Sequence, residues 1–229
     1  MSSGHEKVVP PGSSSAWRSG KLAEGSTGAD VKLSAAAEAR VQEIVSRYPH
    51  SKSAVMPMLY VAQEELGWVN DAAIAWVANR LQLPVAHVIE VATFYTMYYK
   101  KPVGKYHFQV CRTLSCMLCG AKKVTAQLRK NFGIEAGEVS GDGMWSYEEV
   151  ECLGSCGTAP MVQVNDVFFE NLALSDGSIE DAVDALIEKL KREQPNLRFS
   201  ERSGLLGEGM PEHPRSQVWP PTSWEGSKS

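Results

Sequence analysis

Apolar residues recur at helical spacing through the first half of the chain and form four short amphipathic segments. Helix-breaking residues, among them Pro49 and Gly67, and short polar connectors separate these segments. Four helices joined by short connectors predict a compact helical bundle over residues 33–102. The residues placed to start the helices are Ser34, Ser53, Asp71 and Pro84.

Four aromatic residues lie at the end of the predicted bundle: Phe94, Tyr95, Tyr98 and Tyr99. Aromatic side chains bury large apolar areas, and a packed core is their usual place. We therefore expect this group to pack against the domain that follows rather than to stack on a cofactor.

From residue 103 onward the chain alternates between short strand-like runs and amphipathic helices. Asn165-Asp166 indicates a two-residue hairpin, and Ser178 with Asp181 resembles a capping box. The predicted order, strand–helix–strand–strand–strand–helix, favours a small α+β sandwich of thioredoxin type over residues 103–194. The predicted elements are strands at 106–110, 145–150, 161–164 and 167–169, and helices at 121–132 and from 179.

The two ends of the chain show no periodic pattern of apolar residues. Residues 1–32 are rich in glycine, serine and proline, which predicts a flexible leader. Residues 195–229 are rich in proline and predict an extended tail. Trp219 and Trp224 lie in this tail, where contact with a partner surface and plain disorder are both open interpretations.

Charge and hydropathy argue against two classes of protein, those that bind nucleic acids and those that span a membrane. The formal net charge is −4 and the pI is about 5.8, which argues against a nucleic-acid-binding surface. The longest apolar run, Ala72 to Ala78, is too short to span a membrane, and the amino terminus shows no signal pattern. We therefore expect a cytosolic chain, in which clustered cysteines are more often metal ligands or redox groups than disulfides.

The cysteines are concentrated in one stretch of the chain. All five lie between Cys111 and Cys156. Four of them form two pairs, Cys111-x4-Cys116 and Cys152-x3-Cys156, in segments that also carry glycine, and Cys119 is left over. Four thiolates in two pairs suit a [2Fe-2S] cluster, which takes two protein ligands on each iron. We therefore assign Cys111, Cys116, Cys152 and Cys156 as ligands of one such cluster.

A zinc site is the first alternative. Zinc sites favour C-x2-C pairs, and neither of the two assigned pairs has that spacing. A Rieske-type centre needs histidine ligands, but neither His50 nor His107 lies in a C-x-H pattern. We interpret both histidines as ordinary structural or surface residues and favour iron–sulfur over zinc.

Two further alternatives use Cys119. A plant-type ferredoxin pattern takes Cys111, Cys116, Cys119 and Cys152, but it leaves Cys156 unused. A thioredoxin-like dithiol uses only Cys116 and Cys119 and leaves three cysteines without a role. No nucleotide-binding loop, Ser/His/Asp set or pair of catalytic carboxylates is evident in the sequence. We therefore predict an electron-transfer subunit without a catalytic site of its own.

Several segments of the chain resemble one known family. They are F-Y-T-M-Y at 94–98, K-P-V-G-K-Y-H at 101–107, Q-V-C-R-T-L-S-C-M-L at 109–118, C-L-G-S-C-G-T-A-P at 152–160 and V-N-D at 164–166. Over about residues 33–192 the chain resembles the E subunit, NuoE type, of the proton-pumping NADH:quinone oxidoreductase, respiratory complex I. The resemblance does not include the leader or the tail, and Cys119 lies outside the family's four-cysteine pattern.

The resemblance implies a helical bundle followed by a thioredoxin-like ferredoxin domain that holds one [2Fe-2S] cluster on Cys111, Cys116, Cys152 and Cys156. It implies a flavoprotein partner that binds NADH and FMN and carries a [4Fe-4S] cluster, beside the large iron–sulfur subunit and the rest of complex I. The chain would accept single electrons from reduced flavin at the cytoplasmic face of the plasma membrane, without inserting into it. The equivalent subunit of an NAD-reducing hydrogenase or NAD-dependent formate dehydrogenase is the alternative. Pro160 stands where thioredoxin-like folds often keep a cis-proline.

Overall fold

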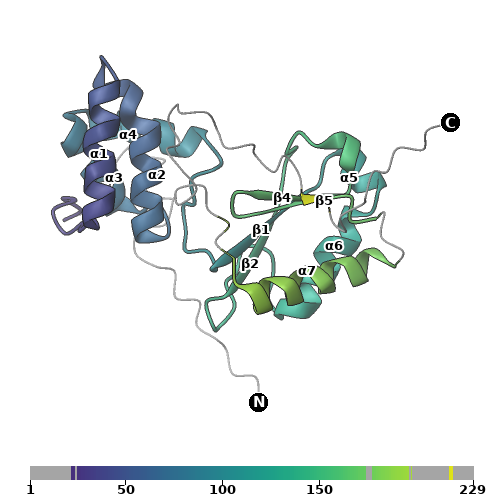
Figure 1. Ribbon diagram of the computed structural model, residues 1–229. Helices are drawn as coiled ribbons and strands as arrows, with labels where there is room; N and C mark the ends of the chain where they lie inside the picture. The colour runs from purple at the N-terminus through teal and green to yellow at the C-terminus, as the bar shows by residue number, and fades with distance from the viewer. Residues whose placement is uncertain (1–21, 24, 174–176, 196, 198–216, 219–229) are drawn as a thin grey trace. The chain divides into compact units, whose positions relative to one another are not determined.

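The computed structural model describes residues 22–23, 25–173, 177–195, 197 and 217–218. The chain divides between Pro102 and Val103 into two compact units, and each is described by itself (Figure 1). Most of the predicted leader and tail, including Trp219 and Trp224, lies outside the described residues.

The first unit is helical and consists of α1 (Ala35–Arg47), the 3-10 helix η2 (Ser51–Ala54), α2 (Val55–Leu66), α3 (Asp71–Leu81) and α4 (Val85–Phe94). Helix α2 contacts α1, α3 and α4 and is therefore the centre of the packing. Ser34 caps α1 as predicted, because its side chain accepts the N–H of Ala37 at 3.1 Å. Gly67 ends α2 in the left-handed conformation, with φ 81°, also as predicted.

Three predicted helix starts are wrong by one or a few residues. Asn70, not Asp71, caps α3, since its side chain accepts the N–H of Ala73 at 2.8 Å. Asparagine and aspartate are nearly equal as N-caps, so the sequence alone does not separate two adjacent candidates. Ser53 lies within η2, and Pro84 is the residue before α4 rather than part of its first turn.

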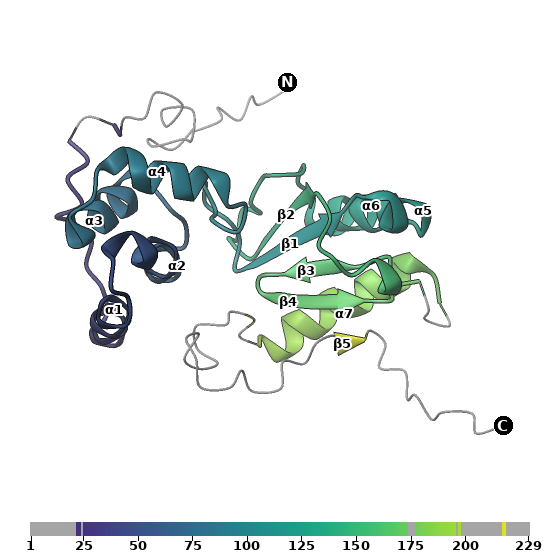
Figure 2. The same ribbon diagram turned by 90° about the horizontal axis from the view of Figure 1, so that it is seen from above.

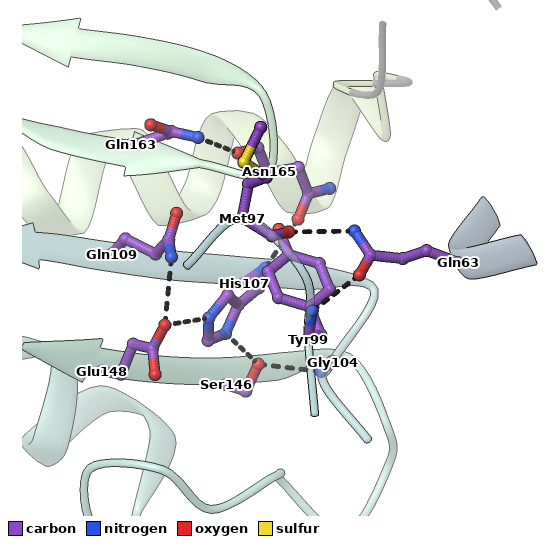
Figure 3. A network of polar contacts seen from close by, with 10 residues as sticks. All are labelled: Gln63, Met97, Tyr99, Gly104, His107, Gln109, Ser146, Glu148, Gln163 and Asn165. Carbon is purple, nitrogen blue, oxygen red and sulfur yellow. Dashed lines mark hydrogen bonds and ion pairs between the residues drawn. The ribbon is translucent and has the colours of Figure 1, made fainter. Parts of the chain in front are cut away.

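The aromatic group at the end of α4 is only partly buried. Tyr98 is buried and donates its hydroxyl to a backbone oxygen of α2 at 3.0 Å. Tyr99 is buried too, and its N–H donates to the side-chain oxygen of Gln63 at 2.6 Å (Figure 3). Phe94 is 78% exposed and takes no part in the core of the first unit, and its predicted packing against the following domain stays a prediction. It lies about 200° around the helix from the buried Ala92 and therefore faces away from the bundle core.

The second unit is built on a sheet of β1 (Tyr106–Cys111), β2 (Trp145–Val150), β3 (Val162–Val164), β4 (Val167–Glu170) and β5 (Gln217–Val218). The strand order is β2-β1-β3-β4-β5. Strand β1 pairs in parallel with β2 and antiparallel with β3, and β4 pairs antiparallel with β3 and in parallel with β5. The central strand β1 is buried along its whole length, as expected for a strand paired on both edges.

The remaining elements of this unit are α5 (Leu114–Leu118), α6 (Ala121–Phe132), the 3-10 helix η3 (Cys156–Thr158) and α7 (Ile179–Glu193). Helices α6 and α7 pack on each other along one face of the sheet (Figure 1). Figure 2 shows α5 beside α6 at one end of the sheet. The predicted α+β order is confirmed, and α5 and β5 are additions that the sequence analysis did not expect.

Local signals account for the ends of these elements. Gly133 ends α6 with φ 65°, and Ser178 and Asp181 form the predicted capping box at the start of α7. Asn165, with φ 52°, occupies the predicted hairpin turn between β3 and β4. None of the helices in the described ranges is both long and apolar enough to cross a membrane.

Candidate metal centre

The two parallel strands β1 and β2 deliver both cysteine segments to the same edge of the sheet. Cys111 is the last residue of β1 and is paired in register with Val150, the last residue of β2. Cys116 follows Cys111 in α5, and Cys152 follows Val150 in the next loop, which leads to Cys156 at the start of η3. Since parallel strands end at the same edge, the fold brings together segments that are far apart in the sequence.

The four thiols interact as two pairs. Sγ of Cys152 lies 3.9 Å from Sγ of Cys156, and the side chain of Cys116 is close enough to Cys111 to help lower the pKa of its thiol. Two thiolates on one tetrahedral metal, with bonds of about 2.3 Å, are about 3.8 Å apart. The charge of Cys111 also acts on Cys156, so the two pairs lie in the same part of the second unit. The separation of Cys152 and Cys156 therefore suits shared coordination of one metal ion.

A single metal ion and a two-iron cluster make different demands on the ligands. No three His, Cys, Asp or Glu side chains among the described residues converge closely enough to hold one metal ion. Two cysteine pairs instead offer two ligands to each of two metals, and thiolate donors are the ligands that iron–sulfur clusters take. The donor set therefore fits a [2Fe-2S] cluster better than a lone zinc.

The inner pair, Cys111 and Cys116, is buried, whereas Cys152 and Cys156 are exposed. Burial by itself would raise the pKa of the Cys111 thiol. The N–H groups of Thr113 and Leu153 outweigh this effect, together with the side chains of Cys116 and Thr113, so the pKa of Cys111 is lowered.

Cys116 and Cys156 shift in the opposite direction. Burial raises the pKa of Cys116 to about 11, and the N–H of Met161 only partly opposes this. The hydrogen bond and the charge of Cys152 raise the pKa of Cys156. A bound cation would compensate the charges of thiolates at this site.

Two buried polar atoms lack partners within the described segments, and both belong to residues around this centre. They are Oγ1 of Thr113 and Oε2 of Glu170. The Thr113 hydroxyl is close enough to Cys111 to help lower the pKa of the thiol, but it makes no well-aligned hydrogen bond. A buried hydroxyl normally donates a hydrogen bond. The sulfur atoms of a cluster could accept one from Thr113. Neither residue belongs to a motif that could be recognised in the sequence.

The loop between Cys152 and Cys156, here called the outer cysteine loop, also directs a backbone N–H group to a cysteine sulfur. The N–H of Gly154 donates to Sγ of Cys152 at 3.3 Å, and Gly154 has φ 83°, a conformation that favours glycine. The Ala159–Pro160 peptide bond is cis, as the family resemblance predicted.

The spare cysteine lies at the rim of the centre. Cys119 is exposed and ends α5, where its N–H donates to the backbone oxygen of Ser115 at 2.9 Å. Among the described residues, no hydrogen bond links the Cys119 thiol to another cysteine, and all five cysteines are free thiols. Cys116, its partner in a dithiol, instead acts on the pKa of Cys111.

Two histidines were considered above as ligands of a Rieske-type centre. His50 is exposed in the first unit. His107 is buried in β1, with Nδ1 at 2.8 Å from Oγ of Ser146 and Nε2 at 3.2 Å from Oε1 of Glu148 (Figure 3). Gln109 donates to the same oxygen of Glu148 at 3.0 Å. This polar group joins the beginnings of β1 and β2, at the end of these strands away from the cysteines.

Comparison with known proteins supports the same fold. The E subunit of the NADH-quinone oxidoreductase of Rickettsia bellii (strain RML369-C) is 41% identical over 155 residues, which cover 66% of this chain and 89% of the relative. NADH-quinone oxidoreductase subunit 2 of Thermus thermophilus is 44% identical over 128 residues, 55% of this chain and 71% of the relative.

A solved structure shares the fold at lower identity. The crystal structure of an NAD+-reducing [NiFe]-hydrogenase in the air-oxidized state superposes with a TM-score of 0.51 and 22% identity, over 62% of this chain and 23% of that chain. Residues 41–191 match the family described as thioredoxin-like [2Fe-2S] ferredoxin. This chain therefore belongs to the thioredoxin-like [2Fe-2S] ferredoxins, in the family of the E subunits of the NADH-quinone oxidoreductases.

Proposed function

We propose that this chain is the electron-transfer subunit of the NADH dehydrogenase part of an NADH-quinone oxidoreductase, with one [2Fe-2S] cluster on Cys111, Cys116, Cys152 and Cys156. The observation that carries the proposal is the parallel pairing of β1 with β2, which brings two cysteine pairs to one edge of the sheet. When bound, such a cluster supplies one-electron redox chemistry.

The chain's own residues hold the thiolates and compensate their charge. Backbone N–H groups of Thr113, Leu153, Gly154 and Met161 act on the sulfur atoms of three of the four cysteines. Hydrogen bonds to ligand sulfur favour added negative charge and so adjust the reduction potential. Through these N–H donors the polypeptide makes reduction of the cluster more favourable.

The electron donor in this proposal is reduced FMN on a partner flavoprotein, which takes its electrons from NADH and carries a [4Fe-4S] cluster. Apolar side chains exposed beside the centre support a partner surface there: Leu114 is 71% exposed and Leu118 78%. Large apolar side chains in contact with water commonly mark protein–protein contacts. Through the flavoprotein and the large iron–sulfur subunit, the chain works at the cytoplasmic face of the plasma membrane.

The equivalent subunit of an NAD-reducing hydrogenase or formate dehydrogenase would use the same centre. The relatives at about 40% identity favour NADH-quinone oxidoreductase, because the hydrogenase structure is only 22% identical to this chain. Purification from native cells separates the two assemblies through the subunits that accompany the chain. Recovery of hydrogenase subunits in place of quinone oxidoreductase subunits would contradict the proposed assembly.

The cofactor is tested on the 229-residue chain purified without oxygen. We expect red-brown protein with about two irons and about two acid-labile sulfides per chain, and an EPR signal after chemical reduction. Colourless protein that contains one zinc per chain, or a disulfide between Cys116 and Cys119, would overturn the proposal.

A further inference from the structure

Glu170 is a buried acidic residue that contacts the loop between Cys152 and Cys156. It is the last residue of β4 and is 3% exposed. Among the described residues only one other carboxyl-bearing residue, Asp71, is buried, and it belongs to the first unit. A buried carboxylate is unfavourable unless hydrogen bonds or charges compensate it, so its position calls for a physical reason.

Both hydrogen bonds that the Glu170 side chain accepts come from the segment around Cys156. The hydroxyl of Ser155 donates to Oε1 of Glu170, and the hydroxyl of Thr158 donates to the same oxygen at 2.5 Å. Ser155 directly precedes Cys156, and Thr158 ends the single turn that Cys156 begins. The carboxyl group therefore contacts the chain on both sides of this cysteine.

The same turn is closed by further contacts. Oγ of Ser155 lies 2.7 Å from Oγ1 of Thr158, whose N–H donates to the backbone oxygen of Ser155 at 3.2 Å. The N–H of Asn171, next to Glu170, donates to the backbone oxygen of Thr158 at 2.8 Å. The end of β4 thus holds the turn through backbone and side-chain bonds together, although Cys156 itself is exposed.

The charge of Glu170 has little compensation. No Lys, Arg or His of the described residues lies within ion-pair distance of Glu170, and its Oε2 has no hydrogen-bond partner among them. The two hydroxyl groups of Ser155 and Thr158 converge on its other oxygen, Oε1. A fixed negative charge in a poorly solvated place opposes the addition of an electron nearby.

We propose that Glu170 is a positioning residue for the redox centre: through Ser155 and Thr158 it holds the Cys156 turn, and its buried charge lowers the midpoint potential. This inference rests on the proposed function, because it requires a cluster on the assigned cysteines. It assigns a role to a residue that lies outside the cysteine motifs and touches no ligand directly.

Two substitutions separate the mechanical part of the role from the electrostatic part. Glu170→Gln keeps an oxygen that accepts the two hydroxyl bonds and removes the charge, so we expect an assembled cluster with a raised midpoint potential. Glu170→Ala removes the acceptor as well, and we expect the cluster to be lost from the oxidised chain on the order of tenfold faster. The measurements are EPR-monitored redox titration and the decay of visible absorption.

Glu151→Gln is the matched control. It also removes one carboxylate, and it lies next to Cys152, but its side chain is 79% exposed and pairs with Arg112 at 2.7 Å. Solvent screens such a charge, so we expect a smaller potential shift than for Glu170→Gln and an unaltered rate of cluster loss.

The outcomes distinguish this inference from the function on which it rests. A Glu170→Gln potential shifted no more than that of Glu151→Gln, or an unaltered rate of cluster loss in Glu170→Ala, would overturn the role of Glu170 and leave the cluster assignment intact. Failure of the unsubstituted chain to take up a cluster would overturn the proposed function itself.

Discussion

Cys111 and Val150 are register partners at the ends of two parallel strands. The N–H of Arg112 donates to the backbone oxygen of Val150 at 3.0 Å, so the pairing extends one residue beyond β1. From this point one segment turns into α5 with Cys116 and the other into the loop with Cys152. Neither segment could form the centre alone, because each supplies only one pair of thiols.

The ligand assignment predicts different results for two cysteines that are both exposed. Cys156→Ser should abolish or strongly perturb the EPR signal of the reduced cluster, because one of its four thiolates is lost. Cys119→Ser should leave the signal intact, because Cys119 lies outside the two assigned pairs and no hydrogen bond links its thiol to another cysteine among the described residues. Iron content and EPR spectra of the two variants provide the measurement. The reverse result would favour the plant-type pattern, in which Cys119 is a ligand.

The unpartnered hydroxyl of Thr113 predicts a change in potential without a large change in stability. Thr113→Val keeps the shape of the side chain and removes the group that helps to lower the pKa of Cys111. We expect a lower midpoint potential, since a donor near ligand sulfur is lost. The free energy of unfolding of the metal-free chain should change by less than about 1 kcal/mol, because no well-aligned hydrogen bond is broken.

Thr125→Val is the control for this substitution. The Thr125 hydroxyl is on α6 and donates to exposed Glu149 at 3.1 Å, outside the cysteine loops. Redox titration should give an unaltered potential for this variant. An equal shift in both variants would show that the Thr113 hydroxyl has no specific effect on the centre.

The exposed apolar side chains of α5 predict a contact surface. Leu118→Glu should weaken association with the flavoprotein on the order of tenfold or more, because a charge would be buried without a partner. Ala136→Glu introduces the same charge at another exposed position of this unit and should have little effect. Copurification and binding titration measure the difference, with the EPR signal as a check that the cluster is present. Equal binding by both variants would exclude Leu118 from the interface.

The close approach of Gly104 to β2 predicts a stability difference between two glycines. A Cβ atom at Gly104 would lie 2.6 Å from the backbone carbon of Trp145, whereas one at Gly141 would meet nothing within 4 Å. Gly104→Ala should therefore lower the free energy of unfolding by about 1–3 kcal/mol, and Gly141→Ala should change it by less than about 0.5 kcal/mol. Urea unfolding of both variants gives the comparison. Equal midpoints would mean that the backbone adjusts at Gly104 without strain.

The backbone around the centre could be predicted because its signals are local. The amphipathic pattern of α6 and the glycine that follows it predicted the bounds Ala121–Phe132, which the structure confirms, as it confirms the strand expected at Trp145–Val150. Helix α5 could not be predicted in this way. It has only five residues, and its apolar side chains Leu114 and Leu118 face solvent, so it carries no inward pattern.

Glu170 could not be found from the sequence for a different reason. A glutamate at the end of a strand usually indicates solvent exposure, since glutamate is rarely buried. Its burial depends on the β3–β4 hairpin, which returns the chain to Ser155 and Thr158. The cysteine spacing, by contrast, indicates its chemistry directly, and the four-cysteine ligand set stays a prediction for spectroscopy.

The burial of the four thiols is unequal, with Cys111 and Cys116 covered and Cys152 and Cys156 open. Chelators and oxidants dissolved in water therefore reach the centre from one side only, and its breakdown should begin at the loop after β2. Until a partner subunit covers that side, Cys152, Cys156 and any cluster that they hold stay open to solvent. Assembly of the complex would then protect the cofactor as well as connect it.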